Sequence, residues 1–435
     1  MFDYIIIGAG PGGLGLAHRL NNGTNKIAIV ENDKWGGTCP NYGCDPTKVM
    51  MAVLEAKNRV ENLKGQGITG ELTLDWAGLR GRKIEITDPY EEKMLGGLKG
   101  AGITTLYGTA KFTADAAVEI AGEVYTAKKV IIATGTRARL LDIEGAEFLS
   151  TSNDFLVLDE MPEKVVFLGT GPISLEMAQL ALATGADVTV ISVGALGVGH
   201  FDKEMGDTFI EHLKHEGIKF EEKIAINKVE KTDDGLVISD GKGFELLTDF
   251  VVAGVGRTPN TDMLNLEAVG VETDRGAIKV NEYLQTSNPA IYAMGDVVAK
   301  PEAHLTPVSA FENRYLGRNL GKETPEPIRY PVIPSIIYGP TKLAEVGVLT
   351  GEGITTKLMD LTNWYTYKRL NDPVAKIKVA VNADGEIVGA STLSSVADEL
   401  INLLMIMIEQ KITLSEMDAM ITAYPTVASD LGYFY

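Results

Sequence analysis

One segment of the sequence occurs twice, and this internal repeat constrains the fold more than any other feature. Residues 4–31 read YIIIGAGPGGLGLAHRL…KIAIVE, and residues 165–192 read VVFLGTGPISLEMAQLAL…DVTVIS. A constant offset of 161 residues, the separation of Gly8 from Gly169, aligns the two copies without a gap. Each copy reads as an apolar β run, a glycine-rich turn, an amphipathic helix and a second β run. Such a βαβ unit is typical of dinucleotide-binding domains.

The glycines of the first copy have separate physical tasks. Gly8 permits a tight turn, Gly10 lets a pyrophosphate approach the backbone, and Gly13 lets the helix pack on the strand. The diphosphate is then expected at the helix N-terminus, where free N–H groups and the helix dipole favour an anion. Glu31, 18 residues after Gly13, ends the second β run, where a carboxylate accepts hydrogen bonds from ribose hydroxyls. Two copies of the unit therefore predict two bound dinucleotides.

Length and composition exclude several classes of protein. A chain of 435 residues predicts roughly three domains. A formal net charge of −19 argues against a nucleic acid or an anionic membrane surface as the main partner. The densest apolar stretch, residues 403–408, is far shorter than the roughly 18 residues of a membrane-spanning helix. The chain also opens directly into its first β run, without the basic region of a signal peptide. We therefore expect a cytoplasmic protein with no nucleic-acid or membrane partner.

The chain has only two cysteines, Cys39 and Cys44. Two thiols cannot form a disulfide framework for a chain of this size, nor a structural zinc site by themselves, so we predict no metal site. Asp45 is a good N-cap and Pro46 a good first helical residue, which predicts a helix directly after Cys44. The helix dipole then stabilises a thiolate at Cys44, and Lys48 adds a positive charge one turn on. The pair is predicted to be redox-active; the alternative is two small buried residues in a loop.

Short strands are predicted over residues 100–135, including a hairpin over 118–125 that turns at Ala121–Gly122. A further apolar strand is predicted to end at Gly295–Asp296. A long helix around residues 396–409 is apolar on nearly all sides toward its end, as expected for burial within a domain or between subunits.

These motifs together resemble the class I pyridine nucleotide–disulfide oxidoreductases, the flavoprotein family of glutathione reductase, dihydrolipoamide dehydrogenase and mercuric reductase. The resemblance covers essentially the whole chain. The matching segments are GGTCxNxGCxPxK at 36–48, ATG at 133–135, GRxPN at 256–260, GD at 295–296, LTPV at 305–308 and ADELI at 397–401.

The resemblance implies an α/β fold with two Rossmann-like dinucleotide-binding domains and a C-terminal α+β dimerisation domain. An FAD-binding domain is predicted over 1–145 and 275–325, an NAD(P)-binding domain over 146–274, and a dimerisation domain over 326–435. FAD is expected on the first domain and NADPH or NADH on the second, in a homodimer.

The predicted cofactor contacts, taken from the two glycine-rich turns and the family motifs, form one set. They are Gly8, Gly10, Pro11, Gly12, Gly13, Glu31, Gly37, Thr38, Lys48, Ala133, Thr134, Gly135, Gly169, Gly171, Pro172, Ile173, Ser174, Ser192, Gly256, Arg257, Gly295, Asp296, Leu305, Thr306 and Pro307.

The resemblance also implies catalytic roles. Cys44 is expected to contact the flavin and Cys39 to exchange with the substrate. Lys48 is expected near the flavin N5 and paired with Glu176, because a partner carboxylate favours a charged ammonium at a buried site. The alternative for Glu176 is an ordinary surface position on its helix.

The C-terminal segment AYPTVASD departs from the family's HPTxxE. Tyr424 replaces a histidine general acid/base and Ser429 replaces the glutamate that orients it, with Asp430 one residue further. Tyrosine is a poor base at neutral pH. A metal ion or a quinone needs no such dyad, and mercuric reductase likewise has tyrosine there, but it also delivers metal through a C-terminal cysteine pair that is missing from the LGYFY end of this chain. Alternatively, Tyr424 only fills the pocket, or His304 replaces the proton carrier.

The second nucleotide remains open between NADPH and NADH. Ser192 stands where the first copy has Glu31, and no arginine precedes His200 in the segment that follows. An acid at this position would favour NADH, and an arginine would favour NADPH. Ser174 replaces the third glycine, a small change that should still allow the helix to pack.

We expect an FAD-dependent NAD(P)H oxidoreductase that passes electrons through a Cys39–Cys44 disulfide to a small disulfide substrate. One alternative is an NAD(P)H-dependent metal-ion or quinone reductase, and another is an FAD-bound redox sensor without significant turnover. The predicted catalytic residues are Cys39, Cys44, Lys48, Glu176 and Tyr424.

Overall fold

The structure, a computed structural model, describes residues 1–113 and 117–435. The described chain divides into two compact units. The first comprises Met1–Pro46, Lys83–Arg139 and Gly256–Tyr330, and the second comprises Thr47–Arg82, Leu140–Val255 and Pro331–Tyr435. Two helices continue from one unit into the other, α3 (Cys44–Asn62) and α4 (Trp76–Thr87).

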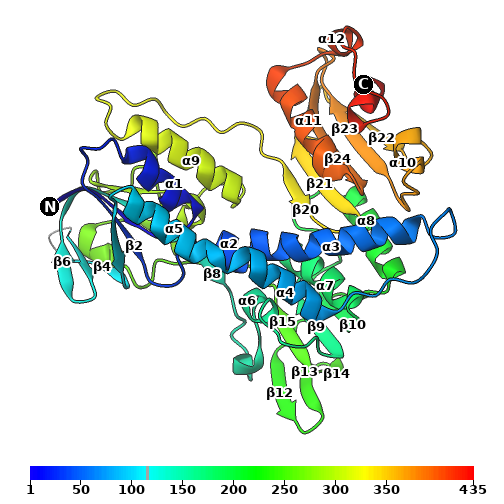
Figure 1. The fold of residues 1–435 in the computed structure, drawn as a ribbon, viewed down its shortest axis with the longest axis horizontal. Helices are drawn as coiled ribbons and strands as arrows, with labels where there is room; N and C mark the ends of the chain where they lie inside the picture. Colours follow the sequence, from blue (N-terminus) through cyan, green and yellow to red (C-terminus); the bar gives the residue numbers. More distant parts are fainter. Residues whose placement is uncertain (114–116) are drawn as a thin grey trace. The chain divides into compact units, whose positions relative to one another are not determined.

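The first unit is built on a five-stranded parallel sheet in the order β19-β7-β1-β2-β3. Its strands are β1 (Phe2–Ile7), β2 (Ile27–Glu31), β3 (Thr104–Tyr107), β7 (Ala127–Ile132) and β19 (Ile291–Ala293). On one face, Ile6 packs in a cluster with Leu16 of α1 (Pro11–Leu20) and Leu316 of α9 (Thr306–Asn319). These two helices lie side by side in Figure 1.

The other face of this sheet is covered by a small antiparallel sheet. Ile5 and Ile7 pack there with Phe112 and Val118, which belong to β4 (Ala110–Phe112) and β5 (Val118–Ile120), followed by β6 (Glu123–Tyr125). Because both faces of β1 are buried, its sequence is a continuous apolar run rather than an alternating one. The predicted hairpin is confirmed, since Ala121 and Gly122 both have positive φ, as a tight hairpin turn requires. The predicted run of strands also includes residues 114–116, which lie outside the described residues.

The remaining elements of the first unit are short. They are α2 (Thr38–Tyr42), α5 (Pro89–Gly100), β8 (Thr136–Ala138), β16 (Arg257–Pro259), η2 (Leu266–Val269), β17 (Thr273–Asp274), β18 (Ala277–Ile278) and η3 (Gly295–Val297).

The second unit repeats this plan with a four-stranded parallel sheet in the order β11-β10-β9-β15. Its elements are β9 (Lys164–Leu168), α7 (Pro172–Ala183), β10 (Asp187–Ile191), α8 (Lys203–Glu216), β11 (Lys219–Glu221) and β15 (Phe250–Ala253). Val165 and Phe167 pack with Leu175 of α7, whereas Val166 and Leu168 face the antiparallel sheet on the other side. That sheet contains β12 (Lys228–Thr232), β13 (Gly235–Ser239) and β14 (Glu245–Thr248); η1 (Ala146–Phe148) and α6 (Ser152–Phe155) precede β9. The predicted repeat is confirmed, because α1 and α7 begin at the paired prolines of the two copies.

The C-terminal part of the second unit is a five-stranded antiparallel sheet in the order β20-β21-β24-β23-β22. Its elements are β20 (Ser335–Ile337), β21 (Lys342–Gly347), β22 (Thr355–Asp360), α10 (Tyr365–Lys368), β23 (Lys376–Val381), β24 (Ile387–Ser394), α11 (Ala397–Gln410), α12 (Leu414–Asp418) and η4 (Val427–Tyr433). Helix α11 lies along β21 and β24 (Figure 1) and buries Leu400, Ile401 and Leu404 against them. The predicted long helix is confirmed, although its burial is one-sided: Ile406 is 48% exposed.

Candidate active site

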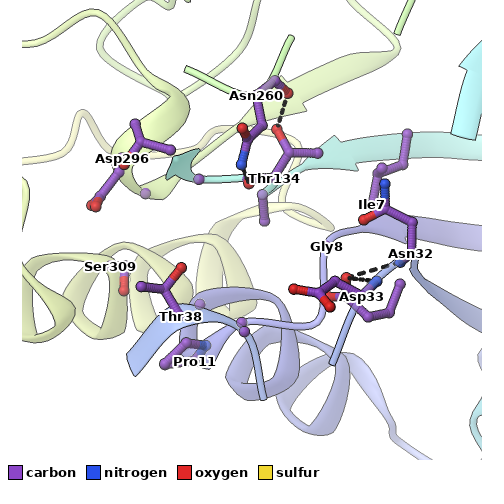
Figure 2. A pocket seen from close by; sticks show the side chains of 18 of the residues that line it. Ile7, Gly8, Pro11, Asn32, Asp33, Thr38, Thr134, Asn260, Asp296 and Ser309 are labelled. Atoms are coloured by element: carbon purple, nitrogen blue, oxygen red, sulfur yellow. Dashed lines mark hydrogen bonds between the residues drawn. The ribbon is translucent and has the colours of Figure 1, made fainter. Parts of the chain in front are cut away.

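A cavity of about 310 Å³ lies in the first unit, where the glycine-rich turn after β1 meets the ends of β2 and β7. Figure 2 shows Pro11, Thr38, Asp296 and Ser309 around it. The predicted residues that line it are Gly8, Gly10, Pro11, Gly12, Glu31, Gly37, Thr38, Cys39, Ala133, Thr134, Gly135, Arg257, Gly295, Asp296 and Thr306. Five other predicted residues of the first unit, Gly13, Cys44, Gly256, Leu305 and Pro307, are not in its lining.

The glycines of the turn differ in the space around them. Gly8 has φ +107°, and a Cβ on Gly13 would lie 2.0 Å from the carbonyl oxygen of Gly8, so α1 could not approach the strand with a larger residue there. Gly10 differs, because a Cβ there would meet no atom nearer than the Cα of Gly37 at 4.0 Å. Gly10 is also the N-cap of α1 and makes no side-chain cap. The open space and the helix N-terminus fit the diphosphate of FAD.

Glu31 ends β2 and is buried, and its carboxylate is fixed by three backbone N–H groups. Ala9 donates to Oε2 at 2.9 Å, and Asn32 and Asp33 donate to Oε1 at 2.8 and 2.9 Å. A carboxylate has about four acceptor positions, so one remains for a ribose hydroxyl.

Thr134 and Asn260 exchange two hydrogen bonds (Figure 2) that hold the segment after β7 to the GRxPN segment.

The GD turn at Gly295–Asp296 is held by a residue that the sequence analysis missed. The carboxylate of Glu312, which is fully buried, accepts hydrogen bonds from Gly295 N at 2.6 Å and from the Tyr330 hydroxyl at 2.6 Å, and it also pairs with the buried ammonium of Lys300. One signal was present: Glu312 lies four residues from both Val308 and Leu316, at a core-facing position of α9.

Arg257 reaches the cavity from β16. Its Nε donates to Thr136 Oγ1 at 2.8 Å and its Nη2 to the Thr136 carbonyl at 2.6 Å. Burial lowers the pKa of the Arg257 guanidinium, and the negative charges of Asp296 and Cys44 oppose that shift. Arginine stays charged at neutral pH even so, and it therefore supplies a fixed positive charge at the cavity wall.

The two cysteines lie at the junction of two helices. Cys39 belongs to α2 and is partly buried, and Cys44 is the exposed first residue of α3; neither sulfur is in a disulfide. The predicted helix after Cys44 is present, but it begins at Cys44 itself, so the prediction of Asp45 as N-cap and Pro46 as first residue was wrong by two positions. Pro46 instead occupies the first turn, where its missing N–H breaks no helical hydrogen bond.

Thr306, at the start of α9, lies beside the two thiols. Its Oγ1 is 3.6 Å from the Sγ of Cys44. A hydrogen bond with Cys44 and burial raise the pKa of the Cys39 thiol, and a hydrogen bond from Thr306 opposes this only in part. In such a coupled pair the proton stays on Cys39, and the negative charge is favoured on Cys44 at the helix N-terminus.

Lys48 and Glu176 form an ion pair in the second unit, the pairing that the resemblance implies. Lys48 Nζ lies 2.5 Å from Glu176 Oε2, and the Glu176 side chain is only 8% exposed, so Glu176 is not a surface residue of α7. Lys48 belongs to α3, four residues after Cys44.

The second glycine-rich turn has the same geometry as the first. Gly169 has φ +97°, and Gly171, the N-cap of α7, has no atom within 4 Å of a Cβ position. Pro172 and Ile173 begin the helix. Ser174 is fully buried, and a Cβ on Gly254 would lie 1.9 Å from its Oγ, so the serine packs α7 directly on that glycine, as expected. Ser192 is buried after β10 and accepts a hydrogen bond from Gly194 N at 3.4 Å.

The residues at the family's dyad positions make local contacts. Tyr424 is 69% exposed, and its ring stacks on that of Tyr365 at 5.9 Å. Ser429 accepts from Thr426 N at 3.2 Å and donates to its carbonyl at 2.6 Å, which caps η4. His304, the alternative proton carrier, is exposed.

Among residues 1–113 and 117–435, no group of three or more histidine, cysteine, aspartate or glutamate side chains has an arrangement that could hold a metal ion. No helix in the same residues is both long enough and apolar enough to cross a membrane.

Comparison with known proteins gives a consistent result along the whole chain. The pyridine nucleotide-disulphide oxidoreductase family matches residues 2–312, and the dimerisation domain of the same family matches residues 333–433. Dihydrolipoyl dehydrogenase from Bacillus subtilis (strain 168) is 31% identical over 98% of this chain and 94% of its own length. Glutathione reductase from Yarrowia lipolytica is 27% identical over 99% of this chain and 98% of its own length, and mercuric reductase from Staphylococcus aureus is 28% identical over 99% and 81%.

Among solved structures, the HOCl-induced flavoprotein disulfide reductase RclA from Escherichia coli has the same fold, with a TM-score of 0.90 and 23% identity over 100% of this chain and 99% of that one. The fold, the family match and the 31% identical relative agree with the predicted fold class. The chain therefore belongs to the class I pyridine nucleotide–disulphide oxidoreductases, the flavoprotein disulfide reductases that use FAD and NAD(P)H.

Proposed function

We propose that this protein is a homodimeric, FAD-dependent NAD(P)H oxidoreductase that reduces a small disulfide through Cys39 and Cys44. The observation that carries the proposal is the position of the cysteine pair: Cys39 lines the cavity that fits FAD, and Cys44 begins a helix beside Thr306. The raised pKa of Cys39 gives the two sulfurs different properties, which a dithiol needs for ordered exchange.

Several residues would hold FAD. The N-terminus of α1 at Gly10 would bind the diphosphate, and Glu31 would bind the ribose. The GD turn at Asp296 would bind the part of FAD that connects the diphosphate to the flavin ring. When bound, FAD would supply transfer of an electron pair from NAD(P)H to the cysteine pair. Gly169, Gly171 and Ser192 would hold the pyridine nucleotide, with NADPH and NADH both compatible with a neutral Ser192.

The sulfur chemistry then follows from the two cysteines. The reduced pair carries two electrons; Cys39, after giving up its proton, attacks one sulfur of the substrate disulfide, and one substrate thiol leaves as that sulfur–sulfur bond breaks. The Cys44 thiolate next attacks the Cys39 sulfur, which releases the second substrate thiol and restores the Cys39–Cys44 disulfide. The sum is NAD(P)H, a proton and a disulfide converted to NAD(P)⁺ and two thiols.

We propose that Lys48 and Glu176 act together next to the flavin. Lys48 follows Cys44 by one helical turn on α3, and Glu176 fixes the ammonium. A positive charge one helical turn from the Cys44 thiolate, and beside the bound flavin, would stabilise the negative charge on each by electrostatics.

One observation favours a second class of acceptor, a metal ion or a quinone. Tyr424 and Ser429 occupy the dyad positions, and Ser429 is committed to capping η4. The reduction of an acceptor that needs no proton from the protein does not depend on the dyad.

The homodimer is supported by exposed apolar residues on the matched dimerisation domain. Ile406 is 48% exposed, Met420 50% and Ile421 fully exposed. An apolar surface of this kind is more typical of an interface than of free surface.

We also propose the three-domain division predicted above and a cytoplasmic location, where a reversible thiol pair stays reducible.

Anaerobic titration of the FAD-loaded protein with NADH and with NADPH tests the proposal. We expect a long-wavelength absorbance band from a Cys44 thiolate against the flavin, absent in Cys44→Ser and retained in Cys39→Ser. Steady-state assays with glutathione disulfide, lipoamide, Cu(II) and a soluble quinone then compare the acceptors. No band and no turnover with any acceptor would contradict the oxidoreductase proposal, and turnover restricted to the metal ion or quinone would replace the disulfide with that acceptor.

A further inference from the structure

Tyr338 contacts both members of the Lys48–Glu176 ion pair. It directly follows β20, and the centroid of its ring lies 4.5 Å from Lys48 Nζ. Its backbone N–H donates to Glu176 Oε1 at 3.1 Å, while the other oxygen of that carboxylate binds Lys48. One residue therefore places a ring face on the cation and an N–H on the anion.

The position of Tyr338 is itself fixed by α7. Gln179, one turn beyond Glu176 and buried, donates from Nε2 to the Tyr338 carbonyl at 3.2 Å. The next residue is Gly339, where a Cβ would lie 2.2 Å from Gln179 Oε1. A close approach of backbone to helix therefore holds the end of β20 on the face of α7 that carries Glu176.

A single carboxylate does not orient a lysine. The Lys48 side chain is 34% exposed and ends in a flexible stem with three N–H donors, so pairing with Glu176 alone leaves its ammonium several orientations. A tyrosine ring attracts a cation to its face. Carboxylate and ring together restrict the ammonium more than the carboxylate alone would.

We propose that Tyr338 is a positioning residue that holds the Lys48 ammonium for the redox reaction, acting through its ring face and its backbone N–H. The inference rests on the proposed role of Lys48 beside the flavin. Loss of the ring is expected to release Lys48 from its fixed position and so reduce its electrostatic effect on the bound cofactor, without removing the charge.

The test compares Tyr338→Leu, which removes the ring, with Tyr338→Phe, which keeps it, in FAD-loaded protein. Tyr338→Leu is expected to lower the flavin midpoint potential and to slow flavin reduction at saturating NAD(P)H by between about twofold and thirtyfold, the range of a cation–π contact. Tyr338→Phe should stay within about twofold of wild type. Tyr107→Leu, which removes an exposed tyrosine of the other unit, is the matched control and should change neither quantity.

A double-mutant cycle with Lys48→Met separates positioning from general structure. If Tyr338 acts through Lys48, Tyr338→Leu has no further effect on the potential or rate once Lys48 is replaced. An equal effect in both backgrounds, or a Tyr338→Phe variant as impaired as Tyr338→Leu, would overturn the inference. Lys48→Met behaving as wild type would instead contradict the proposed role of Lys48. Should Tyr338→Leu lose FAD or melt early, Tyr338→Met offers a more adaptable side chain for the same measurements.

Discussion

The buried carboxylate of Glu312 accepts a hydrogen bond from the backbone N–H of Gly295, with a separation of 2.6 Å. Gly295 lines the cavity, and Glu312 lies on α9 one turn beyond Ser309, which lines it too, as does Thr306 at the start of the helix. The contact therefore ties the GD turn to the helix that also carries Thr306 beside the cysteines. Lys300 neutralises the buried charge.

Replacing this carboxylate should loosen the cavity. Glu312→Gln removes the counter-charge of buried Lys300, which costs about 3–5 kcal/mol of stability, and it weakens the hold on Gly295. Tyr330→Phe removes one neutral donor to the same carboxylate, keeps both charges and should cost less, about 1.5–3 kcal/mol. Urea titration followed by flavin fluorescence checks both; equal midpoints for FAD release in the two variants would argue against a special role for the Glu312 charge.

The two glycine-rich turns offer a paired test of cofactor assignment. Gly10 and Gly171 have φ of −70° and −76°, which alanine adopts freely, and neither Cβ would meet a protein atom nearer than 4.0 Å. Both alanine variants should fold, yet each methyl group would obstruct a diphosphate. We expect Gly10→Ala to weaken FAD binding at least about tenfold, and Gly171→Ala to raise KM for NAD(P)H by a similar factor with FAD retained.

Gly81→Ala, in an open position of α4, is the control for both and should leave FAD content and KM unchanged. The assignment of the two turns would be reversed if Gly10→Ala affected only KM for NAD(P)H and Gly171→Ala only FAD binding.

The pKa of the Cys39 thiol should depend on the neighbouring Cys44. The hydrogen bond with Cys44 and burial raise the pKa of Cys39, so Cys39 holds its proton through neutral pH and forms a thiolate only under alkaline conditions. Cys44→Ala removes the hydrogen bond and the charge but leaves burial, so the pKa of Cys39 should fall, and alkylation at a fixed pH should speed up. Iodoacetamide labelling of Cys39 between pH 6 and 10, in anaerobic reduced protein and read by mass spectrometry, gives the midpoint. An unchanged midpoint would show that burial alone holds the proton.

Restoring the missing dyad should favour disulfide turnover only when both residues are restored. Tyr424→His supplies an imidazole, but it lacks an orienting carboxylate unless Ser429→Glu is added. The glutamate should be tolerated, because Thr426 and residue 429 already stand in the positions of a capping box, where glutamate is a usual partner. We expect glutathione disulfide reduction to rise in the double variant alone.

Tyr424→Phe is the control for that experiment, since it keeps the ring that stacks on Tyr365 and removes only the hydroxyl. If Tyr424 only fills space, Tyr424→Phe should match wild type with every acceptor. A gain from Tyr424→His by itself would contradict the need for an orienting carboxylate.

The sequence by itself determined the features that depend on residues close together in the chain. The repeat predicted both βαβ units because the tight turn after each first strand takes a positive φ at Gly8 and Gly169, a conformation that glycine adopts most readily. The turn at Ala121–Gly122 and a helix next to Cys44 were also predictable, since tight turns and helix starts depend on a few adjacent residues, although the helix begins two residues earlier than predicted.

Only the tertiary structure decided how distant residues complete the site. Glu312 at Gly295, Thr306 at Cys44 and Tyr338 at Lys48 leave no local signature of their partners, because the paired residues come from separate elements. Family motifs implied the Lys48–Glu176 pair across 128 residues, but not the ring and backbone N–H that hold it. Periodicity records which face of an element is buried, whereas the packing of whole elements against one another fixes which charges meet there.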